Sequence, residues 1–230
     1  MSAYQKGDEA VVITDRVRSY PVFYGAAFDH IYISDKPEWI KEKIGNVTWN
    51  FEGEKELTLL GYTTGNETLY KEIKQLQAGE LLYIKQNNIS KKRYHKIKYA
   101  SLTLDIQSWE NIHEQVLETA MRRMLQYAGN HTLVVPLSGG YDSRWIVLML
   151  KKLNVKDVIT FTYGNEDDID VKISKRLAKK LKFKWYFLEY SLQDYEEMYA
   201  SYEYEQYLHF SGKYSSLPHA QDWIAVKKLK

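Results

Sequence analysis

Short apolar runs separated by turn residues fill the first hundred positions of the chain. Such runs predict β-strands. The predicted strands are residues 10–14, 22–28, 31–34, 57–62 and 80–85. Asn87-Asn88 predicts a hairpin turn, and residues 36–44 and 68–73 predict two short helices. We therefore expect a β-rich α+β region over residues 1–98.

The pattern changes after Ile97. Residues 106–128 have the apolar spacing of a long helix, which Gly129 ends. Beyond it, almost wholly apolar runs alternate with helical segments. The expected strands are 132–137, 157–163 and 184–190, and the expected helices are 143–153, 168–181 and one within 216–230. Strands buried on both faces and linked by helices predict an α/β domain with a parallel sheet over residues 99–230.

Composition excludes several kinds of function. The 230 residues include 32 Lys+Arg and 30 Asp+Glu, so the net charge of +2 gives no support to nucleic-acid binding. Since there is no cysteine, disulfides, thiolate metal sites and cysteine nucleophiles are absent. The longest apolar run, Trp145–Leu150, is too short to span a bilayer. We expect a cytoplasmic protein with neither membrane nor nucleic acid as a partner.

The residues most suited to binding a ligand lie in one loop, Ser138-Gly139-Gly140-Tyr141-Asp142-Ser143. It lies between a predicted buried strand and a helix, so backbone N–H groups and a helix dipole converge there. The glycines allow an anion to approach the main chain, and the serines add hydroxyl donors. A carboxylate beside phosphates makes sense when Mg²⁺ joins them. An ordinary helix N-cap would explain one such residue, not six in order.

The loop resembles the SGGxDS signature of the N-type ATP pyrophosphatases, the PP-loop family, at every fixed position. That resemblance implies a doubly wound sheet, ATP and Mg²⁺. It implies nucleotide contacts from Leu137, Ser138, Gly139, Gly140, Asp142 and Ser143, and from the next strand end at Thr162, Tyr163 and Gly164. Asp142 would be the catalytic residue and the metal ligand. An ordinary strand leaving through a glycine turn is the other interpretation of residues 161–164.

The likeness extends to the asparagine synthetase family. The helix starting near Asp170, the strand KWYFLEY and the earlier segment TLYKEIKQLQAG are similar to that family in order. Tyr141 and Arg144 around the loop aspartate resemble members associated with surface-polysaccharide biosynthesis. The resemblance implies that residues 1–98 form a partial, degenerate glutaminase-like (Ntn) region and that residues 99–230 form an ATP pyrophosphatase domain incomplete at its C-terminus.

The departures from the family limit the expected activity. A glutaminase of this type needs an N-terminal cysteine, which the chain lacks, so we expect no glutamine hydrolysis. The resemblance implies an ATP-dependent amidotransferase that adenylates a carboxylate, aspartate in the parent family, for attack by ammonia. Ammonia would come free or from a separate glutaminase, and a second copy or a complementing chain would supply missing parts.

Two other functions stay open. One is a non-catalytic ATP-binding remnant or interaction module. The other is a different PP-loop adenylating enzyme, such as a tRNA-thiolating protein, which the lack of cysteine and of a basic face disfavours.

Other features favour structural explanations. The basic run 91–98 is typical of a solvated edge strand. The tyrosine-rich residues 190–214 predict an amphipathic helix that buries rings, more than a surface for stacking sugars or bases. The histidines lack zinc-site spacing. Acidic residues after Gly164 compensate a helix N-terminus, and among them Asp170 is a candidate for the nucleotide pocket.

Overall fold

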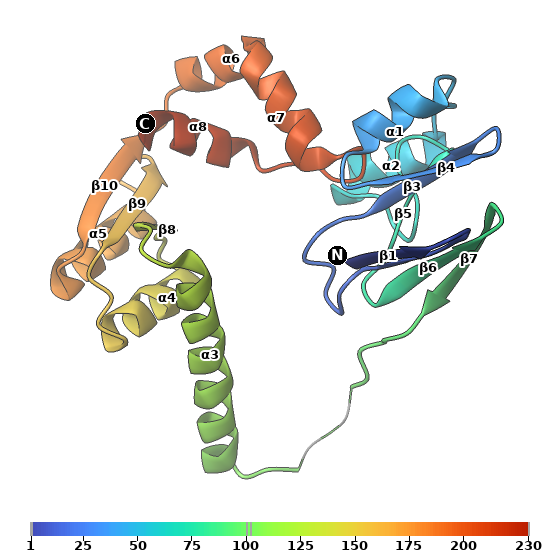
Figure 1. Ribbon diagram of the computed structural model, residues 1–230. Helices are drawn as coiled ribbons and strands as arrows, with labels where there is room; N and C mark the ends of the chain where they lie inside the picture. Colours follow the sequence, from blue (N-terminus) through green and yellow to red (C-terminus); the bar gives the residue numbers. More distant parts are fainter. Residues whose placement is uncertain (1, 100, 102, 230) are drawn as a thin grey trace. The chain divides into compact units, whose positions relative to one another are not determined.

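The computed structural model describes residues 2–99, 101 and 103–229. The chain divides into two compact units. The first comprises Met1–Tyr99 and Tyr199–Ala220, and the second comprises Ala100–Met198 and Gln221–Lys230. Figure 1 shows the helices and strands of both units, most of them labelled.

Two antiparallel sheets form most of the first unit. One has the strand order β1-β2-β6-β7 and the other β4-β3-β5. Their strands are β1 (Ser2–Lys6), β2 (Glu9–Ile13), β3 (Phe23–Ala27), β4 (His30–Ser34), β5 (Ile73–Gln75), β6 (Glu80–Lys85) and β7 (Asn88–Arg93). The α+β expectation for this region is confirmed. β1 is an additional strand that the pattern did not predict.

Apolar side chains pack this unit into layers. Val12 of β2 and Leu82 of β6 pack in one cluster with Val22 and Leu76. On the second sheet, helix α1 (Pro37–Ile44) packs its isoleucines against Phe23 and Ile73. The result is a helix, a sheet and a second sheet in succession, with α2 (Phe51–Leu60) beside them (Figure 1).

A later stretch of the chain also lies in the first unit. Helix α7 (Tyr202–Gly212) belongs to this unit, and the residues after it pair with the segment that follows α2. The Leu217 N–H donates to the Gly61 carbonyl oxygen at 2.7 Å, and Ser216 forms a β-bridge with Tyr62. The predicted domain 99–230 contained this stretch, which therefore joins the first unit in space.

A three-stranded parallel sheet forms the centre of the second unit. It has the order β10-β9-β8 and comprises β8 (Leu133–Pro136), β9 (Val158–Gly164) and β10 (Lys184–Glu189). The predicted parallel sheet is confirmed. These three strands follow one another in chain order, so the doubly wound arrangement stays a prediction.

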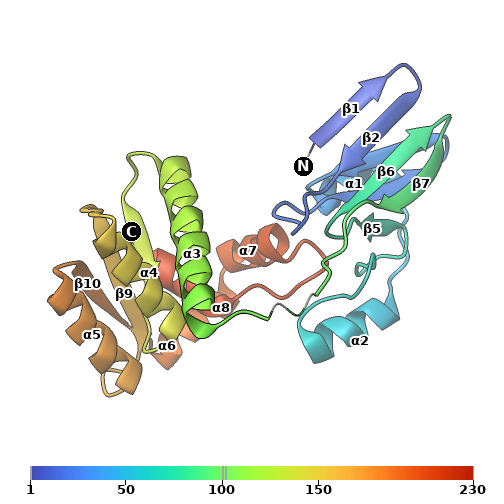
Figure 2. The same ribbon diagram turned by 90° about the horizontal axis from the view of Figure 1, so that it is seen from below.

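Helices cover both faces of the parallel sheet. On one face α4 (Tyr141–Lys152) and α5 (Ile169–Leu181) lie side by side along the strands (Figure 2). Their buried side chains share a cluster with Val135 of β8. On the other face α8 (Ala220–Leu229) packs Ala225 against Phe161 and Leu188. Burial on both faces explains the apolar sequence of the central strand β9, whereas the edge strands β8 and β10 keep exposed apolar residues such as Val134 and Tyr186.

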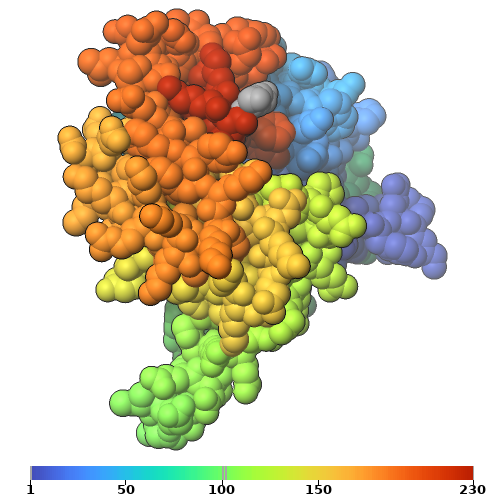
Figure 3. Space-filling model, turned by 90° about the vertical axis from the view of Figure 1, so that its left-hand side faces the viewer, coloured from blue at the N-terminus to red at the C-terminus, as the bar shows by residue number. Residues whose placement is uncertain are grey.

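The remaining helices are α3 (Ile106–Ala128) and α6 (Leu192–Ala200). Met121 in the second half of α3 joins the core cluster around α4. The first half of α3 is largely exposed and projects from the second unit in Figure 3, where it is green. The predicted bounds of α3 are confirmed at both ends, with Asp105 as a side-chain N-cap and Gly129 at the C-terminus.

Two predicted elements of the first unit are wrong. Residues 57–62 were expected to form a strand, but most of them belong to α2. The Asn50 side chain caps that helix, and Gly61 ends it in the left-handed conformation. Residues 68–73 were expected to form a helix, but they form a turn leading into β5. Here the Thr68 hydroxyl donates to the Ile73 carbonyl oxygen at 2.8 Å, an alternative to helical bonding.

Candidate functional site

The segment between β8 and α4 is a tight loop whose serines bond to its own backbone. Ser143 Oγ accepts a hydrogen bond from the Ser138 N–H at 3.1 Å and lies 3.0 Å from Ser138 Oγ. Ser138 Oγ accepts from the Gly140 N–H at 3.2 Å. The expected order of strand, loop and helix is therefore present, and the two hydroxyls hold the loop closed.

The N-terminus of α4 has no side-chain cap. Gly140 occupies the N-cap position and has no side chain that could accept from the first turn. The N–H groups of Tyr141, Asp142 and Ser143 precede the first intrahelical hydrogen bond, so an external acceptor can bind them. Since the helix dipole adds positive potential here, this end of α4 favours an anion such as phosphate.

Arg144 places a cation beside the same helix end. Its Nε donates to the Gly140 carbonyl oxygen at 3.1 Å, and its guanidinium carbon lies 4.6 Å from the centre of the Tyr141 ring. These two contacts fix the guanidinium near the loop. The Asp142 carboxylate is exposed on the first turn and has no hydrogen-bond or ion-pair partner among the described residues.

A buried hydrogen-bond network fixes the strand end that leads into the loop. The Leu137 carbonyl oxygen accepts from Thr162 Oγ1 at 2.7 Å and from Ser174 Oγ at 2.9 Å, and the Ser174 hydroxyl shares its proton with the Asp170 carbonyl oxygen at 2.6 Å. The Leu137 N–H donates to the Phe161 carbonyl oxygen at 2.7 Å. Trp185 Nε1 donates to Thr162 Oγ1 at 3.0 Å. Both backbone groups of Leu137 are thus used inside the protein.

A cavity of about 250 Å³ adjoins the loop at the carboxyl ends of β8 and β9. Its lining residues are Pro136, Leu137, Ser138, Phe161, Thr162, Tyr163 and Asp170. In parallel sheets this is the edge at which ligands bind. The carboxylate of Asp170 lies against Gly139 so closely that a Cβ at position 139 would fall on its Oδ1. The missing side chain of Gly139 therefore allows α5 to place an acid beside the loop.

Strand β9 extends beyond the end of β8 and leaves backbone groups at this cavity. Pro136 is the last residue of β8 paired with β9, opposite Phe161. Since backbone groups two residues apart point to the same side of a strand, the N–H and C=O of Tyr163 face the side where β8 has ended. An adjacent donor and acceptor of this kind suit the edge of a heteroaromatic base. Gly164, with φ of 129°, turns the chain away.

The ring of Tyr163 lies on the face of the sheet that α8 covers, opposite to α4 and α5. It stacks on Tyr190 with centroids 4.9 Å apart and planes 7° apart. Burial raises the pKa of Tyr163, so the phenol stays neutral near neutral pH. Tyr163 therefore contributes its backbone to the cavity, and its side chain contributes to packing beneath α8.

The acidic groups fit a magnesium–phosphate complex better than a metal ion held by protein alone. Within the described part of the chain, no three His, Asp or Glu side chains are grouped so that they could hold a metal ion. Magnesium, however, is commonly bound through one or two carboxylates together with substrate phosphates and water. Asp142 is exposed on the helix turn whose N–H groups are free for an anion, so this donor set fits Mg²⁺ with a bound phosphate.

The predicted site residues all lie at this sheet edge, but their exposure differs. Gly140 and Asp142 are exposed, whereas Leu137 and Thr162 are buried. The partly buried members are Ser138, Gly139, Ser143, Tyr163 and Gly164. Leu137 and Thr162 support the loop from behind, and a ligand contact from either stays a prediction.

Ser174 and Trp185 were not among the predicted site residues. A signal for Ser174 existed in the sequence, because this polar residue stands between Val171 and Ala178 on the buried side of α5. A polar residue on an apolar helix face indicates a buried hydrogen bond. No comparable signal marked Trp185.

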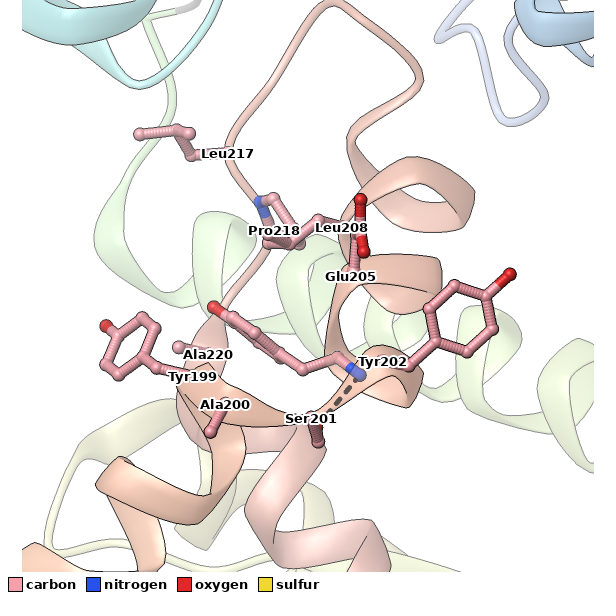
Figure 4. A pocket seen from close by; sticks show the side chains of 10 residues that line it. Tyr199, Ala200, Ser201, Tyr202, Glu205, Leu208, Leu217, Pro218 and Ala220 are labelled. Carbon is pink, nitrogen blue, oxygen red and sulfur yellow. Dashed lines mark hydrogen bonds between the residues drawn. The ribbon is translucent and has the colours of Figure 1, made fainter.

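Another cavity, of about 700 Å³, lies beside α7 in the first unit. Figure 4 shows Tyr199, Tyr202 and Pro218 among the side chains around it. Its described lining residues include the acid Glu205 and no Lys or Arg, so this cavity does not suit a phosphate. The tyrosine-rich stretch forms two helices instead of one, because Ser201 caps α7 by accepting from the Tyr204 N–H at 3.2 Å.

No helix in the described ranges 2–99 and 103–229 combines the length and apolar character needed to cross a bilayer.

Comparison with known proteins agrees with this geometry. Residues 113–209, which include the loop, the cavity and the parallel sheet, match the asparagine synthase family. The expected resemblance to this family is thus confirmed for this segment. A stretch of 61 residues is 38% identical to 7-cyano-7-deazaguanine synthase of Staphylococcus haemolyticus (strain JCSC1435). This stretch covers 26% of the present chain and 27% of that protein, so the chain matches about a quarter of its curated relative.

Proposed function

We propose that the second unit binds ATP with Mg²⁺ and activates a carboxylic acid as its adenylate for attack by a nitrogen nucleophile. With ammonia the products would be an amide, AMP and pyrophosphate, and aspartate is the acceptor that the family match favours. The observation that carries the proposal is the uncapped N-terminus of α4 at the ligand edge of the parallel sheet, next to a cavity.

The first step needs a pyrophosphate group held in place. A carboxylate oxygen attacks the α-phosphorus of ATP, and the bond to the bridging oxygen breaks to release pyrophosphate. The free N–H groups of the first turn of α4 would hold this leaving group, and Arg144 would offset its charge. Mg²⁺ held by Asp142 would neutralise further charge. Such catalysis depends mainly on positioning and electrostatics.

The nucleoside end of ATP would lie at the end of β9. The backbone N–H and C=O of Tyr163 face the open side of the strand and would pair with the edge of the adenine. Asp170 lines the same cavity and would accept hydrogen bonds from ribose hydroxyls. Leu137 and Thr162 would hold the strand ends in register.

The second step would use nitrogen from another source. Ammonia attacks the acyl carbon, AMP leaves, and the nitrogen loses a proton. Since the chain contains no cysteine, we propose that ammonia comes free or from a separate glutaminase. The two antiparallel sheets of the first unit are compatible with a partial glutaminase-like region without hydrolytic function.

Exchange of labelled pyrophosphate into ATP tests the proposal, because it reports reversible adenylate formation. The full chain would be assayed with Mg²⁺ and a panel of carboxylic acids that includes aspartate, glutamate and sugar acids. We expect exchange that requires one of these acids. It should fall strongly in D142N and remain in D167N, since Asp167 is an exposed acid paired with Lys172 outside the cavity.

A protein that binds ATP but shows no exchange across the panel would contradict the adenylation step and favour a non-catalytic nucleotide-binding remnant. A protein that binds no ATP would contradict the nucleotide site as well.

A further inference from the structure

A polar cavity of about 260 Å³ lies in the first unit, separate from the parallel sheet. It is bounded by the segment before β3, the residues after α2 and residues 211–216. Two cationic residues line it, Arg18 and Lys213, and among the described lining residues there is no Asp or Glu. The cavity is therefore positively charged without an internal counter-ion.

The guanidinium of Arg18 is held in a fixed orientation. Its Nη2 donates to the side-chain oxygen of Gln75, which is 2% exposed. Gln75 is itself fixed, since its Nε2 donates to the Glu67 carbonyl oxygen at 2.8 Å and to Thr63 Oγ1 at 3.2 Å. Arg18 also adopts a left-handed backbone with φ of 56°, which is costly for a residue other than glycine. The fold thus keeps this side chain where it is at some cost.

One nitrogen of this guanidinium lacks a partner. Nε of Arg18 is buried and makes no hydrogen bond. Asp15, the nearest acid in sequence, instead accepts from the backbone N–H groups of Val17 and Ser19. Burial lowers the pKa of Arg18, and no carboxylate in the described part of the chain offsets that effect. A buried cationic donor without an acceptor is unfavourable unless a ligand completes it.

We propose that this cavity binds a small oxyanion, either a carboxylate or a phosphate group. Nη2 of the planar guanidinium already donates to Gln75, and the remaining N–H groups are donors that such oxyanions prefer. Lys213 adds a second positive charge, with its Nζ held by the Asp35 carbonyl oxygen at 2.9 Å. The hydroxyl groups of Thr63 and Ser215, both buried, lie in the lining and provide further polar groups.

The test uses the full chain, titrated separately with inorganic phosphate and with acetate. Sodium chloride at matched ionic strength controls for general salt effects. The readouts are the thermal unfolding midpoint and the ¹⁵N–¹H signals of the arginine Nε groups. We expect saturable stabilisation by at least one oxyanion, together with a shift of one arginine Nε signal. The anion that binds shows whether the site is selective for carboxylate or for phosphate.

Variants then locate the binding. R18Q should weaken it at least about tenfold, because it removes a charge-assisted pair. K213Q should weaken it several-fold and still fold, because Nζ bonds a single exposed carbonyl. R16Q is the matched control, since Arg16 is exposed two residues away and should keep wild-type affinity. A response to both oxyanions no greater than to chloride, or wild-type affinity in R18Q or K213Q, would overturn the proposal.

Discussion

Replacing Thr162 by valine tests whether the buried network positions the strand end under the loop. The change keeps the shape of the side chain and removes its hydroxyl. The Leu137 carbonyl would lose one of its two donors, and Trp185 Nε1 would lose its acceptor. A lost neutral hydrogen bond costs about 1 kcal/mol, and a buried unsatisfied donor costs about 1–3 kcal/mol. Because Trp185 is only partly buried, the penalty for its Nε1 lies at the lower end, and we expect T162V to destabilise the second unit by about 2 kcal/mol.

The matched variant is Ser174→Ala. The Ser174 hydroxyl also donates to the Leu137 carbonyl, but its removal leaves Thr162 as a donor and orphans no N–H group. We therefore expect S174A to lower the free energy of unfolding of the second unit by about 1 kcal/mol. T162S keeps the hydroxyl and should lower it by a similar amount.

Native-state hydrogen exchange of amides in β9 would measure these costs within the second unit alone. The Trp185 indole signal should also shift in T162V and stay near its position in S174A. If T162V cost no more than S174A, the network would not hold the strand end, and this reasoning would be refuted.

Three further changes probe the second unit. G139A should destabilise this unit by about 1–2 kcal/mol, because the new Cβ would displace Asp170. G140A should destabilise it less, because its Cβ would meet only Ser138 Oγ, at 3.2 Å. Urea unfolding would compare the two variants, and equal losses of stability would contradict the close packing at Gly139. R144Q should weaken ATP binding at least about tenfold without a change in the unfolding midpoint, and calorimetry showing unchanged affinity would remove its role. Asp194 has its pKa lowered to about 2 by hydrogen bonds from Lys228 and from Ser191. Because the pKa is lower in the folded state, the Asp194 carboxylate stabilises the fold above about pH 4, and this stabilisation is lost as the pH falls toward 2. The free energy of unfolding of D194N should therefore be lower than that of the wild type at pH 7 and close to it near pH 2. A pH-independent difference would argue against the ion pair.

The sequence predicted the parts of the second unit that depend on local patterns. Continuous apolar runs indicated the parallel strands, and the glycine and serine residues at 138–143 indicated the loop. Asp105 and Gly129 marked the ends of α3 because capping is a local interaction. The start of α4 was predicted at Ser143 but lies at Tyr141, so the uncapped N-terminus at Gly140 was not predicted.

Other features depend on distant contacts and could not be predicted in this way. Residues 68–73 have helical composition, but the Leu69 N–H donates to the Tyr214 carbonyl oxygen, and Thr68 bonds to Ile73. Residues 57–62 have the composition of a strand, but the Asn50 cap and Gly61 enclose them in a helix. The contact of Asp170 with Gly139 joins segments that are thirty-one positions apart (170 − 139). It arises from the crossover between β9 and α5.

ATP affinity of the wild type and D142N, each with and without Mg²⁺, tests the central claim most directly. Isothermal titration calorimetry on the full chain would give four dissociation constants for the wild type and D142N, and the same two titrations of D167N would control for removing an exposed acid. If the first turn of α4 binds phosphate through a magnesium ion on Asp142, Mg²⁺ should tighten binding at least about tenfold in the wild type and D167N, and have little effect in D142N. Equal affinity in all four measurements, or no ATP binding by the wild type, would contradict the account.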